Sequence, residues 1–494
     1  MKPFLVLLAC ALVWLCACGP RPGSSGEGRG ILVIAIDGLR ADHLGIGGND
    51  RPATPVLDGL ARQGVWFANA RSTSPDLEGA HASLLTGCDP LLSSRLGKGG
   101  EASSALSRWL IPAAVPSLAE ELLRGGYDTA AFADHPSIDE TLGYGRGFRE
   151  FRALREEDAA LAGEGFEAAS TKFERWLGDR SRSQDWFAYI EAHDLVRQWS
   201  RRQEDPRWSR LYEPRPELLM VPPLGAFRRG FYALSRDRWG GGPITLGEYE
   251  ARYDGELTNL DAKIGRVLER LRATGRLRNT TVIVVGTHGM SFGEGGLYLD
   301  AGKLDDADLH VPLIVRQPLG SGAMTQVHPH VVSLVDVAPT VLELAGIARP
   351  ATMHGVSLMP TLKGDAAPLR RYAFASGGLL QGRSVIDDRY CYEEDRANAI
   401  GDRLVRETWL GTTAVSGGEQ RTHLHDRGLS RAMDHLASTE DGEVQGRLRT
   451  VLRQWMDRVE AARAALQSPG ADARGALESL VDPARSAWAT ESAR

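Results

Sequence analysis

The chain has 494 residues, of which 42% are hydrophobic and 25% are charged, and its formal net charge is −6. This balance is ordinary for a globular protein and allows a large buried core. It argues against a nucleic-acid partner, because the chain has neither an excess of basic residues nor a basic stripe.

The first 18 residues read as a secretory leader. Met1-Lys-Pro3 is a short basic start, and Phe4 to Leu15 is an apolar stretch too short for a stable membrane anchor. Leu15-Cys-Ala-Cys18 resembles the cleavage site of a bacterial lipoprotein, which predicts that Cys18 is lipidated; a plain signal peptide is the alternative. Residues 19–30, rich in Gly, Pro and Ser, would then form a flexible linker.

This leader predicts a protein of the bacterial cell envelope, facing the periplasm or the cell surface. The membrane would be contacted only through the lipid. Gly19 stands where an aspartate would retain the protein at the inner membrane, so the outer membrane is the expected address. Beyond the leader only Cys88 and Cys391 remain, and the sequence leaves open whether they form a disulfide.

Short apolar runs that end in polar residues recur along the chain. Ile31 to Ile36 reads as a strand buried on both faces, and Asp37 follows it. The segment 187–191 ends in Glu191, and the segment 281–286 leads to His288. Because α/β proteins place ligands at the carboxyl ends of strands, the two tips at Asp37 and His288 suggest one shared site. The alternative for Asp37 is that it caps the next helix.

Helical patterns separate these runs. The segment 118–127 is amphipathic and ends in glycines, and a short strand follows at 129–133. Residues 197–247 read as a long irregular excursion, and 334–344 as helical. The alternation predicts an α/β fold with a mixed, mostly parallel sheet and helices on both faces. A further helix is indicated by one apolar stripe: Tyr253, Leu257, Leu260, Ile264, Val267, Leu268 and Leu271.

The character of the chain changes beyond about residue 369. Ser384–Tyr392 and Leu404–Val415 read as hairpin strands, and Val444–Leu466 as a long amphipathic helix. We therefore expect a main domain over residues 31–369 and a smaller α+β subdomain over 370–468. The Gly/Ala/Ser-rich tail, residues 469–494, is expected to be loosely ordered.

Seven segments follow one another over residues 30–465: Ala35–Gly45, Ala80–Gly87, Gly126–Phe132 with Arg146–Phe148, Tyr253–Leu257 with Asp261 and Ile264-Gly265, Thr287–Gly289, Asp336–Thr340 and Gly355–Leu358. Any one of them is a weak signal, and the ordered series is specific. In this order and at these spacings the segments resemble the sulfatase family of the alkaline-phosphatase superfamily.

The resemblance implies a specific chemistry. In the family a divalent metal at the strand ends polarises a sulfate or phosphate ester, and a nucleophile at a helix N-terminus attacks it. That nucleophile is a Cys or Ser matured to formylglycine, or an unmodified Thr or Ser. The implied cofactor is Ca²⁺, Zn²⁺ or Mg²⁺. The implied ligand is an anionic sulfate- or phosphate-ester small molecule or glycan.

The catalytic positions depart from the family pattern. An ungapped count places Leu77 at the nucleophile, and leucine can neither attack nor be matured. Of the metal ligands Asp37 and His288 remain, but Gly38 and Thr287 stand where the family has further aspartates. Ca²⁺ requires six or more oxygens, and Zn²⁺ would need at least one more ligand.

Other polar residues could still take part. His81 matches a histidine of relatives, and Thr73, or Ser74 beside it, could replace the nucleophile only through a shift of about one helical turn. The family's His-x-x-Asp-x-His stretch survives only as Glu191, His193, Asp194 and Val196. Lys303 lies one position from a substrate-binding lysine. The remaining conceivable metal donors are Asp76, Glu78 and Asp300, which read more readily as surface acids.

Three functional hypotheses follow. The first is a divergent sulfatase-like lipoprotein with degenerate catalytic motifs and weak or no hydrolase activity. In the second, an active ester hydrolase with an unusual metal site uses Thr73, Ser74 or a metal-activated water. In the third, the chain is an envelope binding or scaffold protein that uses the excursion at 197–247, rich in Trp and Arg, as its contact surface.

Overall fold

Eight strands form the central sheet of the computed structural model. Their spatial order is β14-β2-β13-β10-β1-β7-β5-β6. All neighbouring pairs are parallel except the two that involve β13, which runs antiparallel to both β10 and β2. The expected mixed, mostly parallel sheet is therefore confirmed. The strands are β1 (Gly30–Ile36), β2 (Val65–Arg71), β5 (Asp128–Ala133), β6 (Glu150–Ala153), β7 (Trp186–Ala192), β10 (Thr280–Gly286), β13 (Leu313–Arg316) and β14 (Gln326–Ser333).

The structure describes most of the chain. The described residues are 26–96, 108–153, 165–200, 205–222, 224–225, 234–235, 244–294, 297–318, 325–378, 382–395, 421–426, 439–468, 472–478 and 480. The leader with Cys18 and the predicted strand over Leu404–Val415 lie outside these ranges.

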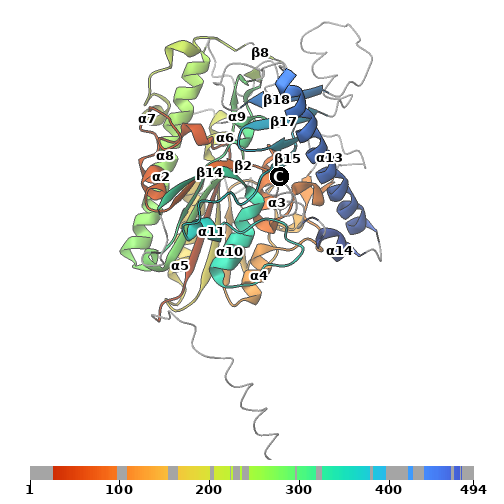
Figure 1. Cartoon of the computed structure of the whole chain (residues 1–494). Helices are drawn as coiled ribbons and strands as arrows, with labels where there is room; N and C mark the ends of the chain where they lie inside the picture. The colour runs from red at the N-terminus through yellow and green to blue at the C-terminus, as the bar shows by residue number, and fades with distance from the viewer. Residues whose placement is uncertain are drawn as a thin grey trace, which may run out of the picture.

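Helices cover both faces of the sheet, as the apolar run of β1 predicts. Ile31, Val33 and Ala35 point into one hydrophobic core, and the alternate residues Leu32, Ile34 and Ile36 point into the other. Figure 1 shows α8 to the left of the sheet and α4 and α10 to its right. One core receives α3 (Leu77–Thr86), α4 (Leu118–Arg124) and α10 (Val337–Ala345); the other receives α2 (Pro55–Ala61), α5 (Phe166–Gly178) and α8 (Leu246–Ala273).

The longest helix of this domain, α8, begins where the excursion ends. Thr245 and Glu248 form a reciprocal capping box that fixes its first residue, Leu246. The predicted apolar stripe is buried, and Tyr253, Leu257, Leu260 and Ile264 are fully so. Helix α8 is thereby pinned along the sheet, and it leads through the short 3₁₀ helix Arg276–Asn279 into β10.

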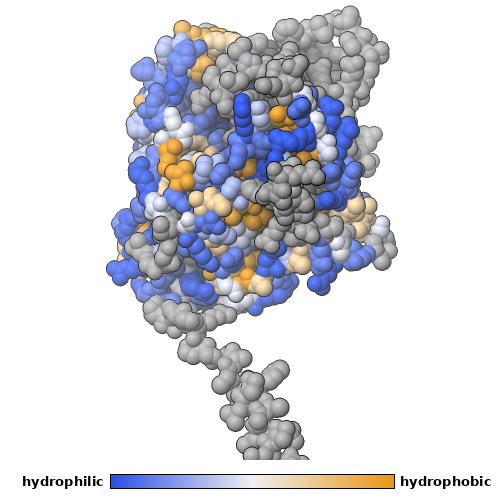
Figure 2. Space-filling view, in the orientation of Figure 1, coloured by the Kyte–Doolittle hydropathy of each residue, from blue (hydrophilic) through white to orange (hydrophobic). Residues whose placement is uncertain are grey.

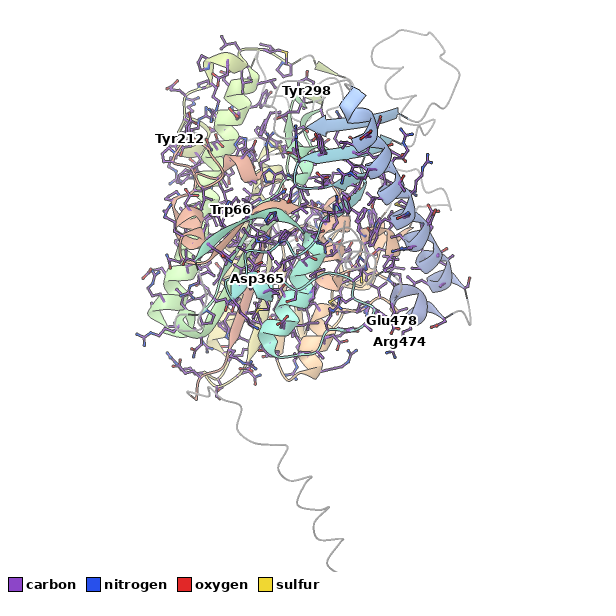
Figure 3. All side chains as sticks on the ribbon, viewed as in Figure 1. Trp66, Tyr212, Tyr298, Asp365, Arg474 and Glu478 are labelled. Carbon is purple, nitrogen blue, oxygen red and sulfur yellow. The ribbon has the colours of Figure 1, made fainter. Side chains whose placement is uncertain are left out.

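Part of the excursion lies against α8. Helix α7 (Pro206–Ser209) packs on α8, as does α6 (Asp194–Arg197), which leads into the excursion, whereas the two-residue strands β8 (Leu224–Gly225) and β9 (Leu234–Ser235) pair with each other. The hydroxyl of Tyr212 lies 3.0 Å from Oγ1 of Thr258, and Figure 3 shows Tyr212 beside α8. A Cβ on Gly255 would lie 1.9 Å from the Trp208 carbonyl oxygen, so only glycine allows this close contact.

The C-terminal region forms a second, antiparallel sheet with the order β15-β16-β17-β18. Helix α13 packs on this sheet, with Trp455 stacked on Phe374 at a ring distance of 4.5 Å. Residues 473–478 form α14, and Leu477 is buried in the main core, so this part of the expected loose tail is an ordered helix. The elements are β15 (Ala373–Gly377), β16 (Gly382–Ile386), β17 (Tyr390–Asp395), β18 (Arg421–Asp426), α13 (Thr439–Gln467) and α14 (Ala473–Glu478).

The surface shown in Figure 2 is mainly hydrophilic, with apolar residues scattered over it rather than gathered into one large patch. Among the described residues, no helix combines the length and the apolar character that crossing a bilayer requires.

The two cysteines of the body are free and buried in different places. The thiol of Cys88 contacts the carbonyl oxygens of Thr86 and Thr352, whereas that of Cys391 contacts the carbonyl oxygen of Leu304. The disulfide that the sequence left open therefore does not form. Burial raises the pKa of Cys88 to about 12, which keeps this thiol protonated and unreactive.

Thiol labelling tests this arrangement. In a chain with Cys10, Cys16 and Cys18 replaced by serine, we expect fewer than about 0.1 thiols per molecule to react in the folded state, because both remaining thiols are buried and protonated. Two should react in guanidinium without any reductant. Cys88→Ser is the control and should leave one. If the unfolded, unreduced chain showed no thiols, the two cysteines would be joined after all.

Candidate functional site

Asp37 is the first residue after β1, and its carboxylate is wholly buried. Nε2 of His81 lies 2.9 Å from Oδ1, and Nδ1 of His193 lies 2.9 Å from Oδ2. The hydroxyl of Thr287 donates to Oδ1 at 2.6 Å. Both carboxylate oxygens of Asp37 are thus hydrogen-bonded to side chains from distant segments. Asp37 does not cap the short 3₁₀ helix that begins at Ala41.

The strand register explains why these residues meet. Ile36 pairs in parallel with Ala192 of β7 on one side and with Gly286 of β10 on the other. The next residue of all three strands therefore emerges at the same carboxyl edge of the sheet. These three residues are Asp37, His193 and Thr287, and α3 brings His81 to the same edge.

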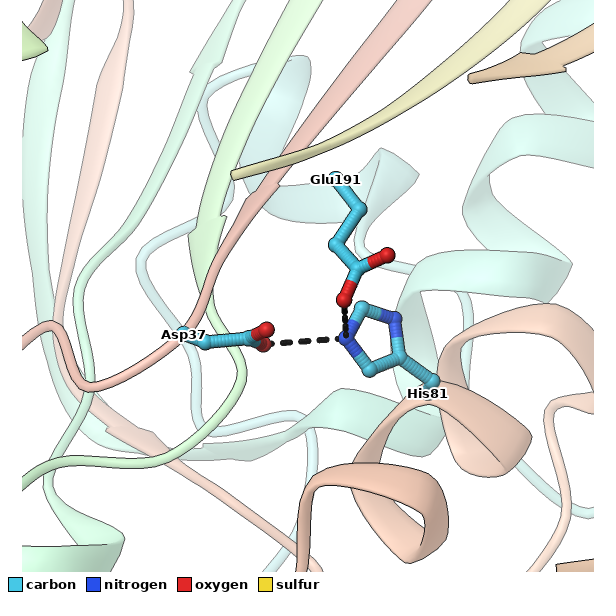
Figure 4. Close-up of side chains that lie close together, drawn as sticks. All are labelled: Asp37, His81 and Glu191. Atoms are coloured by element: carbon cyan, nitrogen blue, oxygen red, sulfur yellow. Dashed lines mark hydrogen bonds and ion pairs between the residues drawn. The ribbon is translucent and has the colours of Figure 1, made fainter. Parts of the chain in front are cut away.

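A second buried carboxylate, Glu191, approaches the same imidazole. Its Oε1 lies 3.8 Å from Nε2 of His81 and has no hydrogen-bond donor. Figure 4 shows Asp37 and Glu191 both approaching the imidazole of His81. Its Oε2 accepts the backbone N–H of Asp134 at 2.9 Å and of His135 at 3.2 Å. Asp37, His81 and Glu191 each offer a ligand atom, and these atoms lie within 4.8 Å of one another. They form a strand-end cluster that could hold a cation.

The two carboxylates of the strand-end cluster differ in their electrostatics. Burial alone would raise the pKa of Asp37, but the imidazoles of His81 and His193 outweigh burial and hold that pKa well below its usual range. Burial, and then the negative charge of Asp37, raise the pKa of Glu191 well above its usual range. The pKa values of the two neighbouring carboxyl groups are therefore shifted in opposite directions.

A second layer of polar contacts supports His193. Its backbone N–H donates to Oδ2 of Asp134, and Asp134 in turn pairs with Arg197 at 2.5 Å. The ring of His135 lies 4.5 Å from that of His193. Burial and the neighbouring His193 lower the pKa of His135 to about 3, so His135 presents a neutral imidazole at this edge.

The predicted nucleophile segment lies at the start of α3. Leu77 is the first residue of that helix, and its side chain packs against the hydrophobic core. The hydroxyl of Thr73 donates to Oγ of Ser83 at 2.8 Å, and Oγ of Ser74 accepts the backbone N–H of Asp76 at 3.1 Å. Among the described contacts, neither hydroxyl reaches the strand-end cluster.

The other residues predicted for the site, His288, Lys303 and Gly38, do not belong to the strand-end cluster. Nδ1 of His288 donates to the carbonyl oxygen of Gly289 at 2.8 Å, and burial lowers the pKa of this imidazole. The backbone N–H of Lys303 donates to Asp308 at 2.7 Å, and the side chain is partly exposed. Gly38 has a φ of +72°, a conformation that favours glycine. None of the three contacts the carboxylate of Asp37 among the described residues.

Asp194, a remnant of the family stretch, has a structural role. Its Oδ1 pairs with Nζ of Lys263 at 2.7 Å, and its Oδ2 accepts the backbone N–H of Phe166 at 2.7 Å. Of the conceivable donors, Asp76 accepts the backbone N–H of Gly378 at 3.0 Å. Neither aspartate belongs to the strand-end cluster.

The sequence reasoning missed the central role of Glu191. The sequence places Glu191 at the end of a predicted strand and, with His193, in the remnant of a family stretch, but it assigns neither residue to the site of Asp37 and does not single out Asp134 or His135. All four residues follow or end a predicted strand, 187–191 or 129–133. The strand-end rule that selected Asp37 would therefore have found them if it had been applied to every strand.

A surface cavity of about 870 Å³ lies elsewhere, between β6 and α5. Its lining includes Lys172 and Arg175 together with Glu140 and Asp179, so its charges are mixed. It contains no residue of the strand-end cluster, whose three members are wholly buried.

Comparison with known proteins gives concordant results. A family model described as Sulfatase matches residues 29–347. An arylsulfatase of Clostridium perfringens is 24% identical over 395 residues, covering 69% of this chain and 80% of that relative. A phosphonate monoester hydrolase of Agrobacterium radiobacter superposes with a TM-score of 0.61 at 19% identity, over 88% of this chain and 96% of its own. A protein solved in complex with its substrate D-glucosamine-2-N,6-O-disulfate superposes with a TM-score of 0.61 at 17% identity, over 88% and 98%.

Proposed function

This chain belongs to the sulfatase family of the alkaline-phosphatase superfamily, and on that premise we propose that it is an exported sulfatase-like lipoprotein with weak or no hydrolase activity. Its site would bind an anionic sulfate or phosphate ester without turning it over efficiently. The ligand class follows from the relatives, one of which was solved with a disulfated glucosamine as its substrate. We extend that class, a sulfated or phosphorylated glycan or small molecule, to this chain.

The observation that carries the proposal is the absence of an attacking atom at the start of α3. A helix N-terminus favours an anionic ester, and the family places its nucleophile there. In this chain that position is Leu77, a partly buried apolar side chain that packs against the core. The nearest alternatives are Thr73 and Ser74. The hydroxyl of Thr73 is hydrogen-bonded to Ser83, and that of Ser74 is hydrogen-bonded within the turn before α3. Removing a nucleophile typically costs several orders of magnitude in rate.

Export and lipidation complete the proposal. The apolar leader and the Leu15–Cys18 motif support an envelope protein anchored through Cys18, with the outer membrane as the expected address. Residues 19–29 would tether β1 at the amino edge of the sheet. Asp37 lies at the opposite, carboxyl edge, so the site would face away from the anchored end of the chain.

An active hydrolase is the second candidate, and the strand-end cluster favours it. Asp37, His81 and Glu191 preserve a group of ligand atoms that a fully decayed site would not need to keep. A divalent metal bound there would polarise the ester. An envelope scaffold that binds through residues 197–247 remains a third candidate. Part of that segment lies outside the described residues, and its exposed apolar side chains include Leu219 and Met220.

Turnover of 4-nitrophenyl sulfate and of a phenyl phosphonate monoester by the purified mature protein tests the proposal. We expect any rate to stay within about 10³- to 10⁴-fold of the rate of the uncatalysed reaction. This is the residual acceleration that binding of the substrate sustains once a nucleophile is lost. Thr73→Val, which removes the hydroxyl but keeps the shape, should leave this rate unchanged.

Two outcomes would contradict the proposal. Efficient turnover that disappears in Thr73→Val would make Thr73 the nucleophile. Efficient turnover that survives in Thr73→Val but disappears in Asp37→Ala would establish the active hydrolase with an unusual site.

A further inference from the structure

One oxygen of the strand-end cluster stands out because it is buried and has no hydrogen-bond donor. Oε1 of Glu191 lies in a wholly buried side chain, beside the imidazole of His81 and the carboxylate of Asp37. A buried acceptor left without a partner costs about 1–3 kcal/mol, so such atoms are rare in native proteins. This oxygen points to a ligand that carries positive charge.

The three protein atoms that could coordinate a cation are oriented by contacts within the protein, and these contacts do not require a bound cation. The hydroxyl of Tyr189 lies 2.6 Å from Nδ1 of His81, so Nε2 is the ring nitrogen that faces the carboxylates. Two backbone N–H groups hold Oε2 of Glu191 and thereby aim Oε1 at His81. His193 fixes Oδ2 of Asp37. Outer contacts of this kind hold metal ligands in place in known sites.

The charges are also consistent with a divalent cation. Two carboxylates meet here, and among the described residues no lysine or arginine contacts either of them. The guanidinium of Arg197 is paired with Asp134 instead. A cation of charge +2 would balance Asp37 and Glu191 and would leave the buried cluster neutral.

The positions that the family resemblance implies for its metal do not converge in this chain. Position 38 is glycine, the hydroxyl of Thr287 donates to Asp37, and Nδ1 of His288 is held by its neighbour's carbonyl oxygen. Asp37 is thus the single implied ligand that takes part in the strand-end cluster. The other two members come from α3 and from β7, and β7 lies on the opposite side of β1 from β10.

We propose that Asp37, His81 and Glu191 bind one divalent cation of the zinc class, relocated toward β7 from the position that the family resemblance implies. Two carboxylates and one imidazole suit Zn²⁺ or Co²⁺, whereas Ca²⁺ takes six to eight oxygens. Three protein ligands with one open position are typical of catalytic rather than structural zinc sites. His193 is a positioning residue that holds Asp37. The inference deepens the proposed function by naming the cation of its site, and it does not require turnover.

Metal content and metal affinity test the inference independently of turnover. The untagged mature protein is stripped with EDTA and titrated with Zn²⁺, Co²⁺, Ca²⁺ or Mg²⁺. Elemental analysis, the shift in melting temperature and the visible spectrum of bound Co²⁺ are then recorded. We expect one Zn²⁺ or Co²⁺ per chain, a rise in melting temperature, and a Co²⁺ spectrum typical of low coordination number. Ca²⁺ should not compete at equal concentration.

Two variants locate the cation. Glu191→Gln should weaken Zn²⁺ binding at least about 100-fold, because a ligand is lost. It should not destabilise the metal-free protein, because the new amide can donate to Asp37. A purely structural role of Glu191 would not produce this combination. His288→Gln is the matched control and should change Zn²⁺ affinity less than about threefold.

Two outcomes overturn the inference. Absence of stoichiometric metal together with no shift in melting temperature would mean that a proton, not a cation, joins the two carboxylates. Loss of affinity in His288→Gln but not in Glu191→Gln would return the cation to the family position. Bound metal without turnover leaves both proposals standing, whereas efficient turnover with bound metal overturns only the proposed inactivity.

Discussion

Replacing Thr287 with aspartate should lower the free energy of unfolding by about 3 kcal/mol in EDTA. The change converts a hydroxyl that donates to Asp37 at 2.6 Å into a second buried carboxylate facing the first. The new carboxylate and that of Asp37 would then lie in the same buried cluster as the carboxyl group of Glu191. Millimolar Zn²⁺ or Ca²⁺ should restore about 2–3 kcal/mol, because a ligand that binds only the folded state stabilises it. Guanidinium unfolding with and without metal measures both effects.

The control for this prediction is Thr287→Asn, which is almost the same size as the aspartate and keeps a donor for Asp37. It should cost less than about 1.5 kcal/mol and should not respond to metal. A Thr287→Asp variant as stable in EDTA as the parent chain would contradict the prediction. That result would mean that position 287 does not face Asp37 closely enough for repulsion to matter.

Replacing Asp336 with alanine should cost about 3–5 kcal/mol, the range found when one partner of a buried ion pair is removed. The carboxylate is wholly buried and accepts the backbone N–H groups of Ser333 at 2.9 Å and Val356 at 2.7 Å. It also pairs with Arg370, which is buried and leads toward the C-terminal sheet. Without Asp336 the guanidinium loses its counter-charge. Chemical unfolding at pH 7 measures the loss.

A double variant separates the charge from the hydrogen bonds. Asp336→Ala combined with Arg370→Met removes both charges, and it should recover part of the loss. The remaining deficit should correspond to the two unmade backbone hydrogen bonds, about 2 kcal/mol. If the double variant were less stable than Asp336→Ala alone, Arg370 would have other stabilising partners and the pairing would not be the main cause.

Elements with a strong local pattern were predictable from the sequence. The apolar run Ile31–Ile36 matches the buried strand β1, and the stripe from Tyr253 to Leu271 is the buried face of α8. The segment Val444–Leu466 lies within α13. In each case the periodicity of apolar residues already encodes which face is buried, so no knowledge of distant neighbours is needed.

The limits of that reasoning appear where spacing in the sequence carries no information. The antiparallel direction of β13 could not be inferred, because a buried apolar strand reads the same in either direction. Helix α14 was expected to be loose because its composition is small and polar, yet Leu477 docks into the main core. Tertiary contacts overrode the local preference at that helix.

The sequence by itself determined the fold class, the position of Asp37 at a strand end, and the presence of an apolar Leu77 at a helix start. Each depends on local patterning or on residue identity alone. Only the tertiary structure decided which side chains surround Asp37. The parallel register of β1 with β7 and β10 brings residues 156 and 250 positions away to within 3 Å of its carboxylate. Register depends on packing between whole strands and helices, and for that reason the partnership of Glu191 with His81 became visible only in the folded protein.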